Sequence, residues 1–147
     1  METNATNRVI NFHYLVPRFT FSRRSTLKSF LARIFVLENV ALDSLTCVFC
    51  SDNFLLEMNR LHLSHDYYTD IITFNLADGA PVAGELYISI DRVRENAKEL
   101  HLPLQTELLR VIFHGVLHLC GYKDSNATQR EEMRAAEDKY LNLYALV

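Results

Sequence analysis

The sequence contains few of the residues that interrupt or separate regular structure. Its 147 residues include four glycines, three prolines and no tryptophan. There is no Ser/Gly-rich linker, no low-complexity segment and no repeat with a solenoid period. A chain of this length, 49% hydrophobic, has enough apolar material for one core but not for two comfortable ones. We therefore expect one domain over residues 1–147.

Long apolar runs and a strong excess of one charge are absent as well. No apolar run approaches the roughly 20 residues that span a bilayer, and the first eight residues are polar, unlike a secretory leader. The net charge of −3 excludes the broad basic surface of a general nucleic-acid binder, so any such role needs a local patch. We expect a cytoplasmic protein that binds neither membranes nor DNA.

Cysteine is too scarce for a disulfide scaffold. The three cysteines, at positions 47, 50 and 120, cannot all pair, which fits a reducing compartment. Cys47 and Cys50 have the spacing of a CxxC motif, but the segment Leu45–Cys50 is typical of a strand, whose side chains alternate between faces. The pattern therefore predicts two buried thiols on opposite faces rather than a redox or metal-binding pair.

Hydrophobic periodicity predicts strands and helices that alternate along the chain. Strands are expected at Val9–Val16, Leu45–Cys50, Ile71–Phe74 and Gly84–Ile90. Three helices are expected to begin at the N-caps Ser25, Asp52 and Asp91, a fourth to run from Pro103 or Thr106 to Gly121, and a fifth to start near Thr128. This order predicts an α+β or α/β-like domain with a sheet of about four strands and about five helices.

One local concentration of positive charge surrounds the helix expected after Ser25. A solvated helix face is the simpler interpretation of this cluster, and contact with the phosphates of RNA is the alternative. The candidates for such contact are Arg23, Arg24 and Lys28.

Two histidines in the predicted fourth helix are the strongest functional signal. His114 and His118 are four residues apart, so a helix projects both from one face of an otherwise apolar segment. Each buried imidazole needs a polar partner; a hydrogen bond can satisfy each separately, and one shared metal ion satisfies both. Gly121 is expected to end the helix in the left-handed conformation, and Asp124 follows as a third ligand. The pattern predicts a metal site of His114, His118 and Asp124 with one open position.

Gly115 bears on the type of chemistry. Zinc proteases of the H-E-x-x-H type carry a glutamate general base directly after the first histidine, where this chain has glycine. Proteolysis by that mechanism is therefore disfavoured. We also expect the missing side chain to let a large substrate approach the metal.

The segment His114–Tyr122, together with Thr69–Phe74 and Gly84–Ser89, resembles the bacterial YbeY family of metal-dependent endoribonucleases. The resemblance covers roughly residues 45–137. It implies an α+β fold in which the metal helix is central and packs beside a mixed, mostly parallel sheet. It also implies a bound Zn²⁺ and cleavage of single-stranded RNA in maturation of the 3′ end of small-subunit ribosomal RNA and in ribosome quality control. The implied partners are ribosomal RNA and the small ribosomal subunit.

The chain departs from the family pattern at two positions. The usual third ligand is a histidine, and Asp124 stands there; a carboxylate makes the ion a weaker Lewis acid than three imidazoles would. An oxygen ligand also raises the expectation of Mn²⁺ or Fe²⁺, although Zn²⁺ remains the first choice. The alternative for Asp124 is a turn residue. Many family members carry an arginine, thought to be catalytic, at the position of Leu63, so that role is not transferred.

Two further residues are weaker catalytic candidates. His65, beside Asp66, lies in the loop before the third strand and is either close to the metal or a solvated loop residue. Arg110 lies one turn before His114, where it can contact phosphate or pair with a carboxylate such as Glu107.

Two other functions compete with RNA cleavage. One is a ribosome-associated assembly factor with a mainly structural metal and little catalysis, favoured by Leu63 and the weaker Lewis acid. The other is a non-haem iron oxygenase, because two histidines and a carboxylate form its facial triad. No double-stranded β-barrel pattern surrounds the three residues, which disfavours the oxygenase.

Overall fold

The computed structural model describes residues 9–65 and 67–147, which form one α+β domain. In chain order the elements are β1 (Ile10–Tyr14), α2 (Arg24–Leu37), β2 (Leu42–Cys50), α3 (Asp52–Leu63), β3 (Ile71–Asn75), β4 (Val82–Ser89), α4 (Ile90–Glu99), α5 (Leu104–Leu119) and α6 (Ala127–Tyr144). The sheet order is β1-β2-β4-β3. Strands β1, β2 and β4 are parallel, and β3 is antiparallel to β4. The expected fold, with a mostly parallel sheet and five helices in the described residues, is confirmed.

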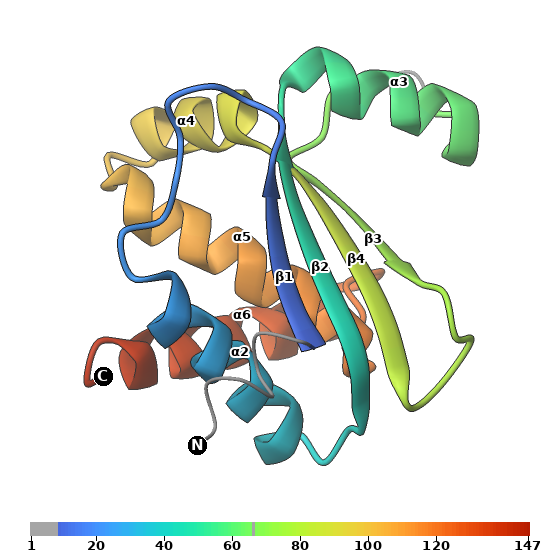
Figure 1. Cartoon of the computed structure of the whole chain (residues 1–147), viewed down its shortest axis with the longest axis vertical. Helices are drawn as coiled ribbons and strands as arrows, with labels where there is room; N and C mark the ends of the chain where they lie inside the picture. Colours follow the sequence, from blue (N-terminus) through green and yellow to red (C-terminus); the bar gives the residue numbers. More distant parts are fainter. Residues whose placement is uncertain (1–8, 66) are drawn as a thin grey trace.

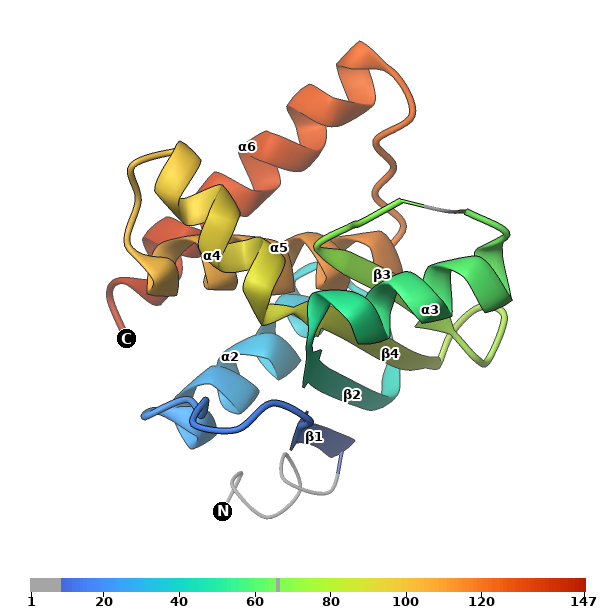
Figure 2. The ribbon, with the colours of Figure 1, turned by 90° about the horizontal axis from the view of Figure 1, so that it is seen from above.

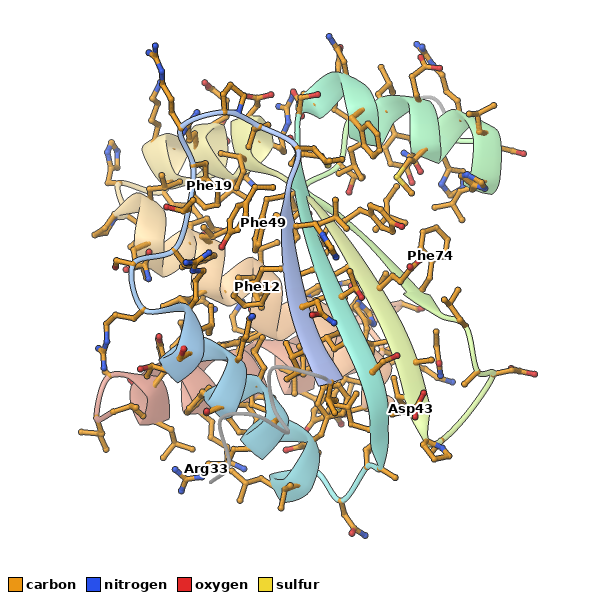
Figure 3. All side chains as sticks on the ribbon, in the orientation of Figure 1. Phe12, Phe19, Arg33, Asp43, Phe49 and Phe74 are labelled. Atoms are coloured by element: carbon orange, nitrogen blue, oxygen red, sulfur yellow. The ribbon has the colours of Figure 1, made fainter. Side chains whose placement is uncertain are left out.

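The helices are divided unequally between the two faces of the sheet. Helices α2, α4, α5 and α6 lie on one side, and α3 lies on the other, near one end of the strands (Figures 1 and 2). Figure 3 shows Phe12, Phe19 and Phe49 gathered on the α2 side and Phe74 on the opposite side. The larger core therefore fills the space between the sheet and α5. None of the helices in the described residues has the length and apolarity needed to cross a membrane.

The two cysteines of β2 lie on opposite faces of the sheet, as expected. Cys47 belongs to the larger core, whereas Cys50 packs with Leu55 and Ile72 on the α3 side. Both are fully buried, and burial raises the pKa of each thiol to about 12. A thiol with so high a pKa is a poor nucleophile and a poor metal ligand at neutral pH. The interpretation as buried strand thiols is therefore confirmed.

The predicted N-caps of three helices are wrong by one or two residues. The helix expected to start at Ser25 begins at Arg24, with Arg23 at the cap position. Ser51 caps α3 and Ser89 caps α4, each accepting a hydrogen bond from a backbone N–H three residues on. Asp52 and Asp91 instead form hydrogen bonds that link the start of α3 to the start of α4.

These bridging contacts explain why Asp52 and Asp91 do not cap their own helices. The carboxylate of Asp91 accepts from the backbone N–H of Asp52 at 2.9 Å. The carboxylate of Asp52 accepts from Ser89 Oγ at 2.9 Å and from Arg92 Nη2 at 2.6 Å. The negative charges still lie in the first turns, where helix dipoles favour them.

Helix α5 is the central helix, as expected from its apolar girth. It packs against β3, β4, α2, α4 and α6. Its buried apolar residues are Leu108, Leu109, Val111, Ile112, Phe113, Val116, Leu117 and Leu119. Because apolar neighbours surround α5, its polar residues near the site lie in one stripe along the helix: Glu107, Arg110, His114 and His118.

Gly115 faces the sheet and not a substrate space, so that expectation is wrong. A Cβ atom at this position would lie 2.6 Å from Ile71 Cδ1 and 2.8 Å from Leu86 Cδ2. Real carbon–carbon contacts are about 3.5–4.0 Å. Glycine therefore allows α5 to pack closely on β3 and β4, and this close approach places the histidines of α5 beside the start of β3.

This packing predicts that Gly115→Ala lowers the free energy of unfolding by about 1 kcal/mol. Overpacking a core typically costs 1–3 kcal/mol, and the better helix propensity of alanine offsets up to about 1 kcal/mol. Ile71→Val removes the Cδ1 atom that would be struck first, so the cost of Gly115→Ala should be smaller in an Ile71→Val background. Urea unfolding of the four proteins of this cycle measures the coupling. Strict additivity would contradict the close approach.

Candidate metal centre

The two histidines of α5 and one aspartate after it converge on a single point. His114 Nε2 and His118 Nε2 are 3.1 Å apart. One oxygen of Asp124, Oδ2, lies 3.4 Å from His114 Nε2 and 3.2 Å from His118 Nε2. The structure thus brings together the three residues predicted as metal ligands, and they form a possible metal site.

The turn after α5 delivers Asp124 to the histidines. Gly121 has a φ of +104°, the left-handed region that glycine tolerates best, as predicted from the sequence. The chain then reverses, with the backbone N–H of Tyr122 donating to Leu117 O at 3.0 Å. The carbonyl of Tyr122 accepts from His118 Nδ1 at 2.9 Å. One short turn therefore orients a histidine ring and returns the third side chain to it.

Glu137 of α6 performs the corresponding role for His114. Its Oε2 lies 2.7 Å from His114 Nδ1, and the residue is only 5% exposed. Its other oxygen, Oε1, accepts from Arg110 Nη1 at 3.1 Å, while Arg110 Nη2 donates to Asp138 at 3.0 Å. The carboxylate is thereby buried with both oxygens paired, which offsets the cost of its desolvation.

The hydrogen bonds fix which ring nitrogens face the centre of the site. The carbonyl of Tyr122 and the carboxylate of Glu137 can only accept, so Nδ1 carries the proton in both histidines. In its neutral form each ring then presents the lone pair of Nε2 to the other ring and to Asp124. Facing lone pairs and a carboxylate repel one another unless a proton or a metal ion lies between them.

The spacing of the three atoms fits a small divalent cation. Bonds of about 2.0–2.1 Å at a tetrahedral angle place ligand atoms about 3.3 Å apart. The three observed separations, 3.1, 3.2 and 3.4 Å, are close to this value. Burial lowers the pKa of His114, but the hydrogen bond and charge of Glu137, with Asp124, outweigh burial and raise it. The same negative surroundings attract a metal ion.

Two cavities meet at this cluster. One, of about 240 Å³ and here called the α6 cavity, lies between α5, α6 and the start of β3. The other, of about 640 Å³ and here called the α3 cavity, lies between β3, the end of α5 and the loop after α3. Asp70, Ile71, His114 and Asp124 line both. The candidate metal site is therefore accessible from two cavities.

Two further carboxyl groups, those of Asp70 and Glu107, line the α6 cavity together with His114. Burial raises the pKa of Asp70, and the charge of His114 partly offsets this. Burial also raises the pKa of Glu107, which is 5% exposed and has one oxygen without a hydrogen-bond partner. Asp70 and Glu137 are not among the site residues predicted from the sequence, and Glu107 was expected there only as a partner of Arg110.

For Glu107 and Glu137, the helical spacing in the sequence indicates a position near the site. Glu107, Arg110 and His114 are spaced i, i+3, i+7 on α5, so they share one helix face. Glu137 lies on the buried stripe of α6, between Met133 and Tyr140. A charge on an apolar stripe needs a partner on the facing element, which here is α5.

The weaker catalytic candidates are placed differently from one another. His65 lines the α3 cavity together with Leu63, so both belong to the surroundings of the site. Arg110 lines the α6 cavity, but its partners are Glu137 and Asp138 rather than Glu107. Asp66 lies outside the described residues.

The basic cluster of α2 lies apart from both cavities. Arg23 Nη2 donates to the backbone oxygen of Val147 at 3.3 Å, and Lys28 Nζ lies 5.3 Å from the ring of Phe12. Arg24 is exposed at the start of the helix. The cationic residues that line the α6 cavity are instead Arg110, Arg130 and Arg134. In the sequence Arg130 and Arg134 alternate with Glu131 and Glu132, so no local excess of positive charge marks them.

The fold and the site define a class: an α+β domain whose central helix presents a His-x₃-His pair, completed by a carboxylate, between two cavities. Comparison with known proteins identifies the family. The family described as "Endoribonuclease YbeY" matches residues 17–145, and this chain belongs to it. An Endoribonuclease YbeY from Flavobacterium psychrophilum is 40% identical over 136 residues, which cover 92% of this chain and 96% of the relative.

Two further matches agree with this family. An Endoribonuclease YbeY from Cytophaga hutchinsonii is 44% identical over 127 residues, covering 86% of this chain and 89% of the relative. The solution structure of TM1509 from Thermotoga maritima superposes with a TM-score of 0.60 at 26% identity, covering 92% of this chain and 88% of that one. The resemblance identified from the histidine segment is therefore confirmed.

Proposed function

We propose that this protein is a metal-dependent endoribonuclease that cleaves single-stranded RNA, with His114, His118 and Asp124 as ligands of one Zn²⁺ ion. The observation that carries the ligand assignment is the convergence of three ligand atoms, 3.1–3.4 Å apart, with both Nδ1 atoms already occupied by acceptors. Membership of the YbeY endoribonuclease family supports RNA as the substrate.

The residues around the cluster have separable tasks in this proposal. A bound divalent ion supplies Lewis acidity toward a phosphate oxygen or a water molecule. Glu137 and the carbonyl of Tyr122 hold the two imidazoles in the ligating orientation. Arg130 and Arg134, on the wall of the α6 cavity, are placed to attract the RNA backbone. Arg110 is held by two carboxylates, so its contribution is mainly to keep Glu137 in place.

The finer assignments rest on the family resemblance. We propose that the substrate is ribosomal RNA near the 3′ end of the small subunit, and that the protein acts in ribosome biogenesis and quality control in the cytoplasm. The oxygen ligand from Asp124 makes Mn²⁺ or Fe²⁺ the next candidates after Zn²⁺. Contact of Arg23, Arg24 and Lys28 with RNA remains a prediction, for a part of the substrate outside the two cavities.

Metal removal tests the proposed activity. The purified protein should contain about one equivalent of metal by elemental mass spectrometry, and it should cleave a single-stranded RNA faster than the same RNA annealed to its complement. Chelation should abolish cleavage, and adding back Zn²⁺, Mn²⁺ or Fe²⁺ separately should identify the ion that restores it. Full activity in protein shown to be metal-free would contradict the proposal.

Leu63 favours a second candidate, a ribosome-associated assembly factor with little catalysis. Its side chain lines the α3 cavity, where many family members have an arginine. Such a protein would bind small ribosomal subunits equally well with and without metal, and the metal-loaded wild type would leave RNA intact. Sedimentation with purified subunits, run beside the cleavage assay, separates the two functions.

A further inference from the structure

Two aromatic rings in the loop after α3 form a stacked pair. The rings of His65 and Tyr67 have centroids 5.1 Å apart and are inclined by 22°. The Tyr67 hydroxyl lies 2.9 Å from His65 Nδ1. This hydrogen bond links the polar atoms of the two rings to each other. Tyr67 is nevertheless 55% exposed, so the pair presents an aromatic face to solvent.

A buried asparagine holds both members of the pair. Asn59 of α3 is 1% exposed. Its backbone carbonyl accepts from the N–H of His65 at 3.1 Å, and its side-chain amide donates to the carbonyl of Tyr67 at 2.9 Å. Ser64, between α3 and the pair, takes the left-handed conformation with a φ of 55° and turns the chain back over the helix. A buried residue thus anchors the loop on both sides of the ring pair, so the rings are positioned before any ligand arrives.

The pair lies on the wall of the α3 cavity, which also contains the candidate metal ligands. His65 and Tyr67 line this cavity together with His114, His118 and Asp124. Tyr68, the next residue, is almost as exposed at 49%, but it does not line the cavity. Its ring lies instead under the guanidinium of Arg92, at 5.1 Å. Two adjacent tyrosines of similar exposure therefore differ in their access to the site.

The chemistry of the α3 cavity suits a base better than a phosphate. Its described lining residues include no arginine or lysine, and the aligned family arginine is replaced by Leu63. Besides the metal cluster, Asp70 and the ring pair itself, the polar side chains on its wall carry amides and hydroxyls: Asn59, Thr69, Thr73 and Asn75. Away from the metal cluster, such a wall offers no side-chain cation to a phosphate, whereas an exposed aromatic face stacks with any nucleobase.

We propose that the His65–Tyr67 pair is a stacking platform that holds one unpaired nucleobase of the RNA on the α3 side of the metal centre. This inference rests on the proposed function and deepens it. The arginines of the α6 cavity attract the backbone on one side of the metal ligands, and the ring pair positions a base on the other. The platform recognises a base by its π face, so it selects for unpaired nucleotides rather than for a sequence.

Leucine substitution at the two adjacent tyrosines tests the platform. The probe is a short single-stranded RNA carrying one 2-aminopurine, moved stepwise along the chain, with binding measured in chelator so that no cleavage occurs. In wild type, at least one position should show fluorescence quenching by stacking. Tyr67→Leu should abolish that quenching and weaken binding about tenfold, within the range measured for loss of one stacked base. Tyr68→Leu should behave as wild type, and Tyr67→Phe should keep most of the quenching.

The outcomes separate the platform from the endoribonuclease activity. Unchanged binding and quenching in Tyr67→Leu overturn the platform even if the wild type cleaves RNA efficiently. Equal losses in Tyr67→Leu and Tyr68→Leu also overturn it, because they indicate a general effect on the loop. Conversely, quenching that depends on Tyr67 in a protein without cleavage supports the platform and contradicts the proposed function alone. Replacing the responsive nucleotide by an abasic one should weaken binding to wild type but not to Tyr67→Leu.

Discussion

His114→Ala should remove the bound metal and RNA cleavage together. The substitution deletes one of three ligand atoms and leaves His118 Nε2 and one oxygen of Asp124, 3.2 Å apart, as the only partners from this cluster. Loss of an outer hydrogen-bond partner typically costs roughly 10- to 100-fold in metal affinity, and loss of a ligand should cost more. Elemental analysis after gel filtration and the single-stranded RNA assay measure the two effects.

Comparing His114→Ala with a control variant separates loss of the metal from loss of the fold. The His114 side chain is 27% exposed, and Glu137 keeps Arg110 as a partner when the imidazole is removed, so the variant should fold. His13→Ala is the matched control, because His13 is an exposed histidine on β1, a strand that lines neither cavity. It should retain metal and activity. Cleavage at the wild-type rate by metal-free His114→Ala would contradict the ligand assignment and the proposed mechanism together.

The cluster could be predicted from the sequence because its members are close in the chain. His114 and His118 are set by the helical repeat, and Asp124 follows a turn that a glycine makes possible. The order of strands and helices was equally readable, since hydrophobic periodicity reports the buried face of each element directly. Local geometry and local pattern therefore determined most of the fold and the three-residue cluster.

What surrounds the cluster depends on tertiary packing and was missed for that reason. Glu137 reaches His114 from a separate helix, 23 residues further along the chain, and no local pattern states which face of α6 meets α5. Gly115 was interpreted as space for a substrate, but whether a helix glycine faces solvent or a sheet depends on which side of α5 packs on β3 and β4. The N-caps of α3 and α4 differ from those expected for a similar reason, because Asp52 and Asp91 have partners across the α3–α4 contact.

The same distinction applies to the positive charge near the site. Counting along the sequence draws attention to Arg23, Arg24 and Lys28, which are neighbours in the chain. The structure places Arg130 and Arg134 on the wall of the α6 cavity, although in the sequence they are mixed with glutamates on an apparently ordinary surface helix. For RNA approaching the metal ligands, the position of a charge relative to the cavity matters more than its density in the sequence.

Glu137→Gln should weaken metal binding roughly 10-fold or more without unfolding the protein, because it removes the negative charge that holds the His114 ring. Glutamine has nearly the same shape, and its oxygen can still accept from Nδ1, but the neutral amide makes the imidazole a poorer donor to a cation. Asp138→Asn is the matched control: Asp138 pairs with the same arginine at 3.0 Å, is 53% exposed and is not a partner of His114.

The measurement that separates a positioning role from a structural one is a metal titration followed by spectroscopy. Competition with a chromophoric chelator gives the affinity, and the visible absorption of the Co²⁺-loaded protein reports the ligand geometry at saturation. Glu137→Gln should show weaker binding and a shifted Co²⁺ spectrum, together with a lower melting temperature, because the glutamine amide nitrogen cannot accept from Arg110 Nη1. Asp138→Asn should match the wild type in all three. If both variants lose metal affinity equally, the loss arises from the weakened ion pairs of Arg110, and the contact between Glu137 and His114 has no separate effect on the metal centre.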